Sequence, residues 1–71
     1  IPKERIDTLS VYFLDADCVT ERTAEILYTH QSTVKYRLKR IHELLGYDIR
    51  KAPEAFLIYK ALIIMRLINM N

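Results

Sequence analysis

The chain has 71 residues, which fits one domain near the lower size limit for a chain that folds on its own core. Hydrophobic residues make up 51% of the sequence, so we expect a packed core and a surface that is covered in the full molecule. The net charge of +2 does not by itself indicate a nucleic-acid partner, and the single cysteine, Cys18, excludes a disulfide framework and a cysteine-based metal site.

No segment of the chain is predicted to enter a membrane. The most apolar stretch, residues 55–68, is interrupted by Lys60 and Arg66 and is shorter than the roughly 20 residues that a membrane span needs. There is no signal-peptide pattern, and a lone cysteine is typical of a reducing compartment. We therefore expect a soluble, cytoplasmic chain. Because it opens on Ile1 rather than methionine, we also expect it to be part of a longer protein.

A first helix is predicted to begin near Lys3. Ile6, Leu9 and Phe13 recur at helical spacing and mark its inner face. The segment Asp15–Cys18 should end this helix, because aspartate is unfavourable inside a helix and favourable in turns and caps.

A second helix is predicted from residue 19 or 20 to residue 27 or 28. Thr20 is expected to cap its N-terminus, because the hydroxyl can accept a hydrogen bond from a free backbone N–H. The small Ala24 lies at its centre, where two helices that cross steeply need a short side chain. The residues expected to face inward are Thr23, Ala24 and Leu27.

A third helix, residues 31–45, follows a short connection at residues 28–31. His30 or Ser32 is expected to cap its N-terminus, and Gly46 to end it in the left-handed conformation. Glycine is common in a tight turn between two such helices, because one residue there can need a positive φ. This chain has no glycine in that turn.

The third helix has two different faces. At about 100° per residue, its apolar side chains form one narrow seam of Val34, Leu38, Ile41 and Leu45. The side chains that project from the opposite side are Ser32, Tyr36, Lys39 and Arg40. Residues 31–42 contain four Lys or Arg residues and no acid. A helix that packs by one face and offers cations, hydroxyls and an amide on the other suits the major groove of DNA.

The last helix is predicted from about residue 53 to residue 68, after a short connection at residues 47–52 that can hold a helical turn. Pro53 is expected at its first position, where a fixed φ and a missing N–H are no disadvantage. Apolar residues lie nearly all round this helix, which predicts burial nearly all round. The earlier helices can cover only part of it, so the rest should meet another subunit or domain.

An ordered set of short motifs runs through most of the chain. These are Thr23-Ala24, His30, Thr33-Val34, Tyr36-Arg37-Leu38, Arg40-Ile41 and Leu44-Leu45-Gly46. With them the sequence resembles the C-terminal helix-turn-helix domain of the PucR-type family, bacterial regulators that include purine-catabolism and sugar-diacid activators. The resemblance extends upstream to Ile6–Leu9 and downstream through the apolar last helix.

The resemblance implies a DNA-binding output domain at the end of a larger regulator whose upstream domains sense a signal. It also implies that an aromatic residue is normal at Tyr28. The sequence departs from the family at Gln31-Ser32, where Arg-Asn is frequent, and at Val19, where asparagine is frequent. The first departure bears on base preference and the second only on capping.

Eight side chains of the third helix are candidates for contacts with DNA. The N-terminal part of a recognition helix meets base edges, which selects Gln31, Ser32, Lys35 and Tyr36. The candidates for phosphate contacts are Thr33, Arg37, Lys39 and Arg40.

Each of these roles has a structural alternative. Gln31 and Ser32 can instead cap the helix, and the Tyr36 ring can pack against the first helix. Arg37 lies near the apolar seam and can pair with Glu21, Glu25 or another acid.

The sequence therefore predicts an all-α domain of four or five helices with a central homeodomain-like helix-turn-helix, spanning residues 1–71 as a single unit. We expect it to bind double-stranded DNA as a homodimer through the last helix, with two recognition helices about 34 Å apart. The main alternative is a helical oligomerisation or docking module that binds only protein; an RNA-binding helical domain is a weaker one. The sequence offers no catalytic constellation, metal site or cofactor site.

Overall fold

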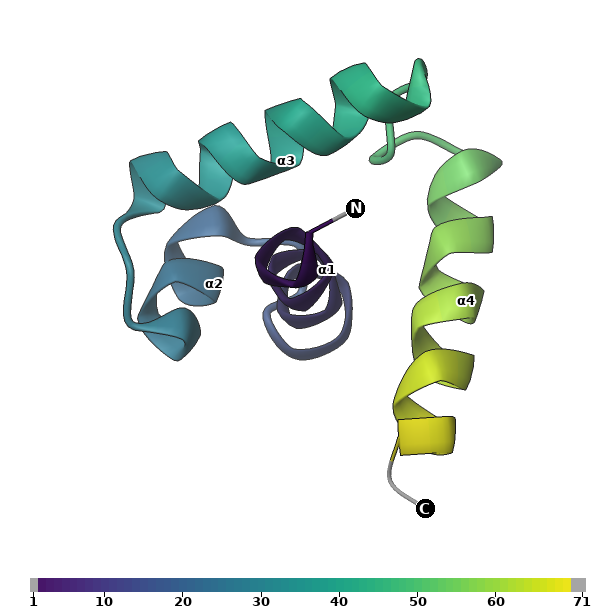
Figure 1. Ribbon diagram of the computed structural model, residues 1–71, viewed down its shortest axis with the longest axis horizontal. Helices are drawn as coiled ribbons and strands as arrows, with labels where there is room; N and C mark the ends of the chain where they lie inside the picture. The colour runs from purple at the N-terminus through teal and green to yellow at the C-terminus, as the bar shows by residue number, and fades with distance from the viewer. Residues whose placement is uncertain (1, 70–71) are drawn as a thin grey trace.

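The computed structural model describes residues 2–69, and these residues form helices and loops with no strand. The all-α prediction is confirmed. Figure 1 shows the helices in chain order: α1 (Lys3–Ser10), a π-helical turn η1 (Val11–Asp15) that continues it, α2 (Thr20–Leu27), α3 (Gln31–Leu45) and α4 (Glu54–Asn69). None of the helices described is both long enough and apolar enough to cross a bilayer.

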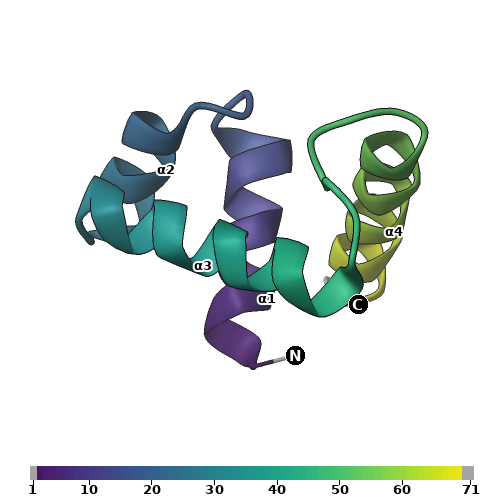
Figure 2. The ribbon, with the colours of Figure 1, turned by 90° about the horizontal axis from the view of Figure 1, so that it is seen from above.

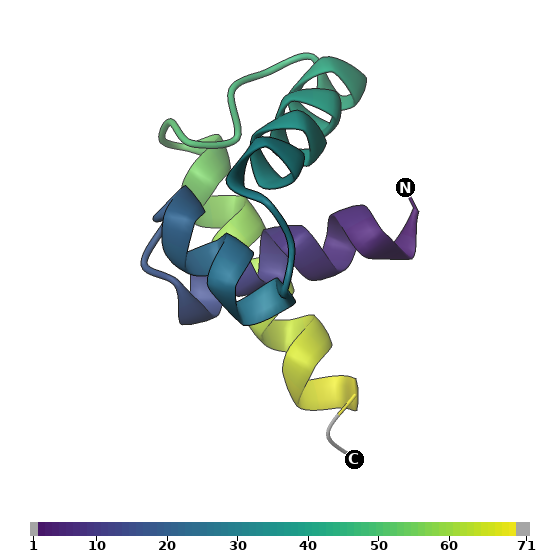
Figure 3. The same cartoon turned by 90° about the vertical axis from the view of Figure 1, so that its left-hand side faces the viewer.

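The first three helices pack around one small core. The predicted seam of α3 is confirmed, because Val34 and Ile41 are fully buried and Leu38 is 8% exposed. They meet Leu9 of α1 and Ala24 of α2, which are also buried. Figures 1 and 3 show α3 lying across the α1–α2 pair, so that one whole side of α3 faces away from the rest of the chain.

The first helix ends in a π turn that its sequence did not predict. The backbone N–H of Ala16 donates to the carbonyl of Val11, five residues back, at 2.9 Å. Tyr12 lies off the predicted inner face but is buried, and its ring meets Phe13 edge-on with 5.3 Å between centroids. The buried face of this helix is therefore wider than the predicted row of Ile6, Leu9 and Phe13.

The helix N-caps agree only in part with those predicted, because α3 has one of its two predicted N-cap residues and α2 does not have its own. Val19, rather than Thr20, is the N-cap of α2, and His30 is the N-cap of α3, but no side chain makes a capping hydrogen bond at either position. The positive φ needed between α2 and α3 falls on Tyr28, at 55°, with its side chain fully in solvent. Gly46 ends α3 with φ 79°, which confirms the predicted left-handed stop.

The last helix stands beside the three-helix body and packs mainly on η1 (Figure 1). Leu62 is the one residue of its described length that is buried, so the earlier helices do cover only part of it. The predicted start is one residue early: the helix begins at Glu54, and the carbonyl of Pro53 accepts the N–H of Leu57 at 3.2 Å. Residues 47–53 form bends and hydrogen-bonded turns, and no part of this connection is helical.

An ion pair fixes α4 to the π turn. Arg66 donates through both terminal nitrogens to the two carboxylate oxygens of Asp15, at 2.7 and 2.8 Å. This bidentate geometry joins residues 51 positions apart. The hydrogen bonds from Arg66 lower the pKa of the Asp15 carboxyl below its usual value.

We expect the Asp15→Asn substitution to lower the free energy of unfolding by about 1 kcal/mol or less at pH 7, because the pair is partly exposed. Since the pKa of Asp15 is lower in the folded state, its contribution is present above an unfolded pKa of about 3.9 and is lost as the pH falls through the folded pKa. Urea unfolding at pH 7 and in acid measures this change. The control is Asp17→Asn, whose carboxylate makes only a single exposed contact with Arg22; equal effects of the two variants at pH 7 would contradict the prediction.

Candidate nucleic-acid interface

The outer side of α3 carries most of the predicted contact residues. Ser32, Lys35, Tyr36 and Lys39 are exposed, and Thr33, Arg37 and Arg40 are half-buried. Tyr36 is 58% exposed, so more than half of its surface is open to solvent and to a partner. The helix has 15 residues and is therefore about 22 Å long, a rod of the size that enters a major groove.

Two lysines on this side are free of internal partners. Within residues 2–69, neither Lys35 nor Lys39 makes a hydrogen bond or an ion pair. Arg40 reaches Glu43 at only 3.5 Å, with both side chains more than 40% exposed. A pair of that length and exposure holds the guanidinium weakly, so Arg40 remains available to another anion.

Arg37 is attached to α1. Its Nη1 donates to the hydroxyl of Thr8 at 3.2 Å, and that buried hydroxyl in turn donates to the carbonyl of Glu4 at 2.7 Å. The partner of Arg37 is therefore a threonine of α1 and not Glu21 or Glu25, because its side of α3 faces α1 rather than α2.

The first turn of α3 is tied to the first turn of α2. The side-chain amide of Gln31 donates to the hydroxyl of Thr20 at 3.0 Å. Ser32 is exposed and makes no capping bond, so neither residue caps the helix. His30 occupies the predicted N-cap position, but its side chain is exposed and makes no capping bond.

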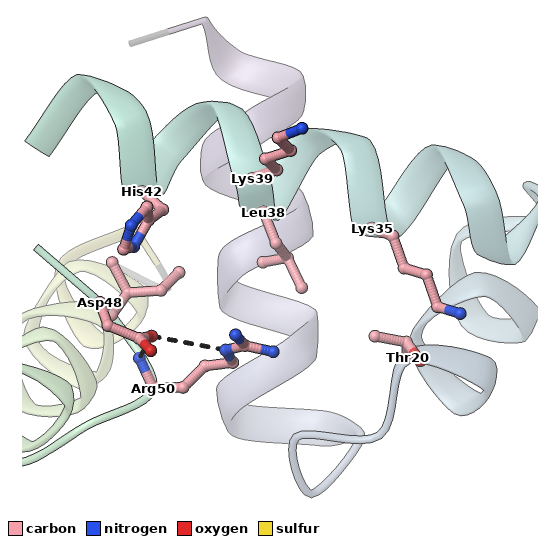
Figure 4. Close-up of a pocket in the computed structure, with 8 residues that line it drawn as sticks. Thr20, Lys35, Leu38, Lys39, His42, Asp48 and Arg50 are labelled. Carbon is pink, nitrogen blue, oxygen red and sulfur yellow. Dashed lines mark hydrogen bonds and ion pairs between the residues drawn. The ribbon is translucent and has the colours of Figure 1, made fainter. Parts of the chain in front are cut away.

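A cleft of about 410 Å³ runs along one flank of α3 (Figure 4). Its walls come from α2, from α3 and from the loop after α3. The lining side chains are Thr20, Lys35, Leu38, Lys39, His42, Asp48, Ile49 and Arg50. Three cations and one carboxylate therefore share this cleft, which leaves it with a positive balance of charge.

The loop side of this cleft was not found from the sequence. Asp48 accepts the backbone N–H of Arg50 at 2.9 Å and the Nε of the same residue at 3.4 Å. These contacts with Arg50, together with the charge of Lys51, lower the pKa of the Asp48 carboxyl. The only sequence signal was an aspartate two residues before an arginine, which is typical of a side-chain turn and says nothing of where the arginine lies.

Comparison with known proteins agrees with this arrangement. Residues 6–64 match the PucR C-terminal helix-turn-helix domain. The chain is 41% identical over 64 residues to the purine catabolism regulatory protein of Bacillus subtilis and 35% identical over 63 residues to the proline-responsive transcriptional activator PutR of the same organism. These alignments cover 90% and 89% of the chain but only 12% and 15% of the two relatives.

No solved structure is significantly similar to the chain. The match to the family domain nevertheless includes α2, α3 and the turn between them, and it continues into α4. The chain therefore belongs to the family of PucR C-terminal helix-turn-helix domains, and it is a DNA-binding domain of the kind found in transcriptional regulators.

Proposed function

We propose that this chain is the output domain of a bacterial transcriptional regulator, acting in the cytoplasm, and that it binds double-stranded DNA sequence-specifically with α3 in the major groove. The observation that carries the proposal is the division of α3 into a buried seam and an exposed side with unpaired lysines. Because the chain covers only 12% of one relative and 15% of another, we also infer that sensing domains precede it in the full regulator.

The base-edge contacts are assigned to the N-terminal half of α3. Lys35 can donate to guanine, and Tyr36 and Ser32 offer hydroxyls to the groove. The bond to Thr20 uses one N–H of the Gln31 amide and leaves the other N–H and the carbonyl oxygen, the two groups that pair with adenine. Gln31 can therefore still pair with adenine, and the bond to Thr20 holds its side-chain amide in one orientation.

The phosphate contacts are assigned to both flanks of α3, since each flank faces one DNA strand. Lys39 lies on the cleft flank, and Thr33, Arg37 and Arg40 lie on the flank toward α1. Arg37 uses one N–H for Thr8, and its guanidinium retains four more donors for a phosphate.

Salt dependence tests the proposed function. We expect the chain to bind a generic 30-base-pair duplex, with log affinity falling linearly against log salt concentration at a slope of about −0.9 per phosphate contact. Fluorescence anisotropy between 50 and 300 mM salt measures that slope. A module that binds only protein would scarcely bind the duplex at any of these concentrations, and that result would refute the proposal.

Replacement of Lys35 or Tyr36 by alanine is expected to change the order of preference among DNA sites rather than to weaken all binding equally. Each lost base contact should cost about 1–3 kcal/mol on preferred sites and little on others. Selection from a random-duplex library with each variant measures this change. Ser10→Ala, on α1, is the control; an unchanged preference for both α3 variants would remove these residues from base readout.

We also propose that α4 joins two copies of the chain. Its exposed large apolar side chains are Phe56, Leu57, Tyr59, Ile64, Met65, Leu67 and Ile68. A second copy is the partner that fits, because a two-fold axis matches this one patch with itself and presents two α3 helices to successive major grooves.

The dimer is expected to dissociate when Leu57 and Ile64 are both replaced by serine, because the exposed apolar area is lost while buried Leu62 is kept. Sedimentation equilibrium over a range of concentrations measures the mass. Ile26→Ser on α2, also exposed, is the matched control. A wild-type chain that stays monomeric throughout, or a double variant with unchanged mass, would contradict this assignment.

A further inference from the structure

The loop between α3 and α4 is held in a defined shape. Ile49 is 2% exposed and belongs to the core, so it anchors the middle of the loop. The Asp48 carboxylate accepts the backbone N–H of Arg50, and the Asp48 carbonyl accepts the N–H of Lys51 at 3.3 Å. A segment with a buried anchor and two local hydrogen bonds presents its outer side chains from a fixed support.

The loop lies on the same side of the molecule as the connection that leads into α2. Figures 2 and 3 show both connections at one edge, flanking the same side of α3. Arg50, Lys35 and Lys39 line one cleft in this region together with Leu38 and Ile49, and Figure 4 shows Leu38 on the side of α3 that faces Arg50. Arg50 therefore extends the row of cations on the cleft flank of α3 beyond the helix itself.

The guanidinium of Arg50 retains most of its donors. Its Nε lies 3.4 Å from Asp48, but its two terminal nitrogens have no acceptor within the described part of the chain. The side chain is 66% exposed. Two parallel N–H groups of this kind match the geometry of a phosphate, and the neighbouring lysines make an anion the favoured partner.

We propose that this loop is a second DNA-contacting element, in which Arg50 binds a backbone phosphate on the strand that faces Lys35 and Lys39. The inference rests on the proposed function, because the same flank of α3 is assigned to DNA. Asp48 has a positioning role: it fixes the loop backbone and leaves the terminal nitrogens of Arg50 directed away from its own carboxylate. The footprint of the domain then exceeds that of the helix-turn-helix alone.

The expected effect of Arg50→Ala follows from the loss of one phosphate contact. The slope of log affinity against log salt should decrease by about 0.9, which is about an eightfold loss of affinity at about 0.1 M salt and little change near 1 M. Arg50→Gln, which removes the charge but keeps the first part of the stem and an amide donor, should have the same effect. Lys51→Ala, which removes the same charge from the next residue but does not line the cleft, should change the slope little.

The test uses the 71-residue chain, a generic 30-base-pair duplex, and urea unfolding of each variant. A loss with Arg50→Ala and Arg50→Gln but not with Lys51→Ala supports the inference. Equal slopes for Arg50→Ala and Lys51→Ala, or a loss with Arg50→Ala that Arg50→Gln does not share, would overturn it and leave the proposed function intact. If the wild-type chain does not bind the duplex, the proposed function itself fails, and the inference fails with it.

Discussion

Alanine at both Lys39 and Arg40 is expected to weaken binding to every duplex by about 60-fold at about 0.1 M salt, because two phosphate contacts of slope 0.9 each are lost. The loss should be alike for preferred and generic sites, since phosphate contacts carry no sequence information. Removal of Arg40 also leaves the Glu43 carboxylate without its partner on the exposed side of α3, where it repels the DNA. Anisotropy measurements across a salt series give both the affinity and the slope.

The control for this double variant removes two positive charges elsewhere. Lys51→Ala with Lys60→Ala changes the net charge by the same amount, but Lys51 lies outside the cleft and Lys60 lies over the ring of Phe56 on α4. If net charge alone governed affinity, the two double variants would bind equally. A Lys39 and Arg40 double variant that binds as tightly as wild type at moderate salt would show that the phosphate assignment is wrong.

Periodicity predicted the parts of the fold that depend on repeated burial. The seam of Val34, Leu38 and Ile41 was predicted because a core helix repeats its apolar residues every three or four positions. Gly46 was predicted to end α3 because a left-handed stop favours a residue without Cβ. Both features are local, so a short stretch of sequence contains the whole signal.

The features that the sequence did not predict depend on contacts between distant residues. The hydrogen bond from Arg37 to Thr8 joins positions 29 apart, and the Arg66–Asp15 pair joins positions 51 apart. No periodic pattern reports such pairs. Thr20 failed as a cap for a related reason: Val19 occupies the capping position, and the Thr20 hydroxyl serves instead as the acceptor for Gln31 on another helix.

Prediction from the sequence fails for the same reason at one side of the cleft. The helical side of the site was predicted because residues 31–40 share one helix with one period. The loop side was not, because the burial of Ile49 and the position of Arg50 beside Lys35 depend on how the chain returns from α3 to α4. A loop residue acquires its neighbours only when the helices on either side of it are packed.

The Ile41→Ala substitution is expected to lower the free energy of unfolding by about 3 kcal/mol, because it removes a fully buried side chain and leaves a cavity. A domain of this size has a free energy of unfolding of about 5 kcal/mol, so most of its stability is at stake. Leu44→Ala, on the same helix but 54% exposed, should change that free energy by about 0.5 kcal/mol or less. Urea unfolding monitored by circular dichroism measures both values.

This pair of variants tests the rotation of α3 about its own axis. Ile41 and Leu44 are three positions apart, and each replacement removes an aliphatic side chain of four carbons down to a methyl group. Helix propensity differs between isoleucine and leucine by only a few tenths of a kcal/mol, about a tenth of the expected effect, so the difference between the two values measures mainly burial. If Leu44→Ala destabilised the domain as much as Ile41→Ala, the buried side of α3 would not be centred on the seam of Val34, Leu38 and Ile41, and the orientation on which the DNA contacts are assigned would be wrong.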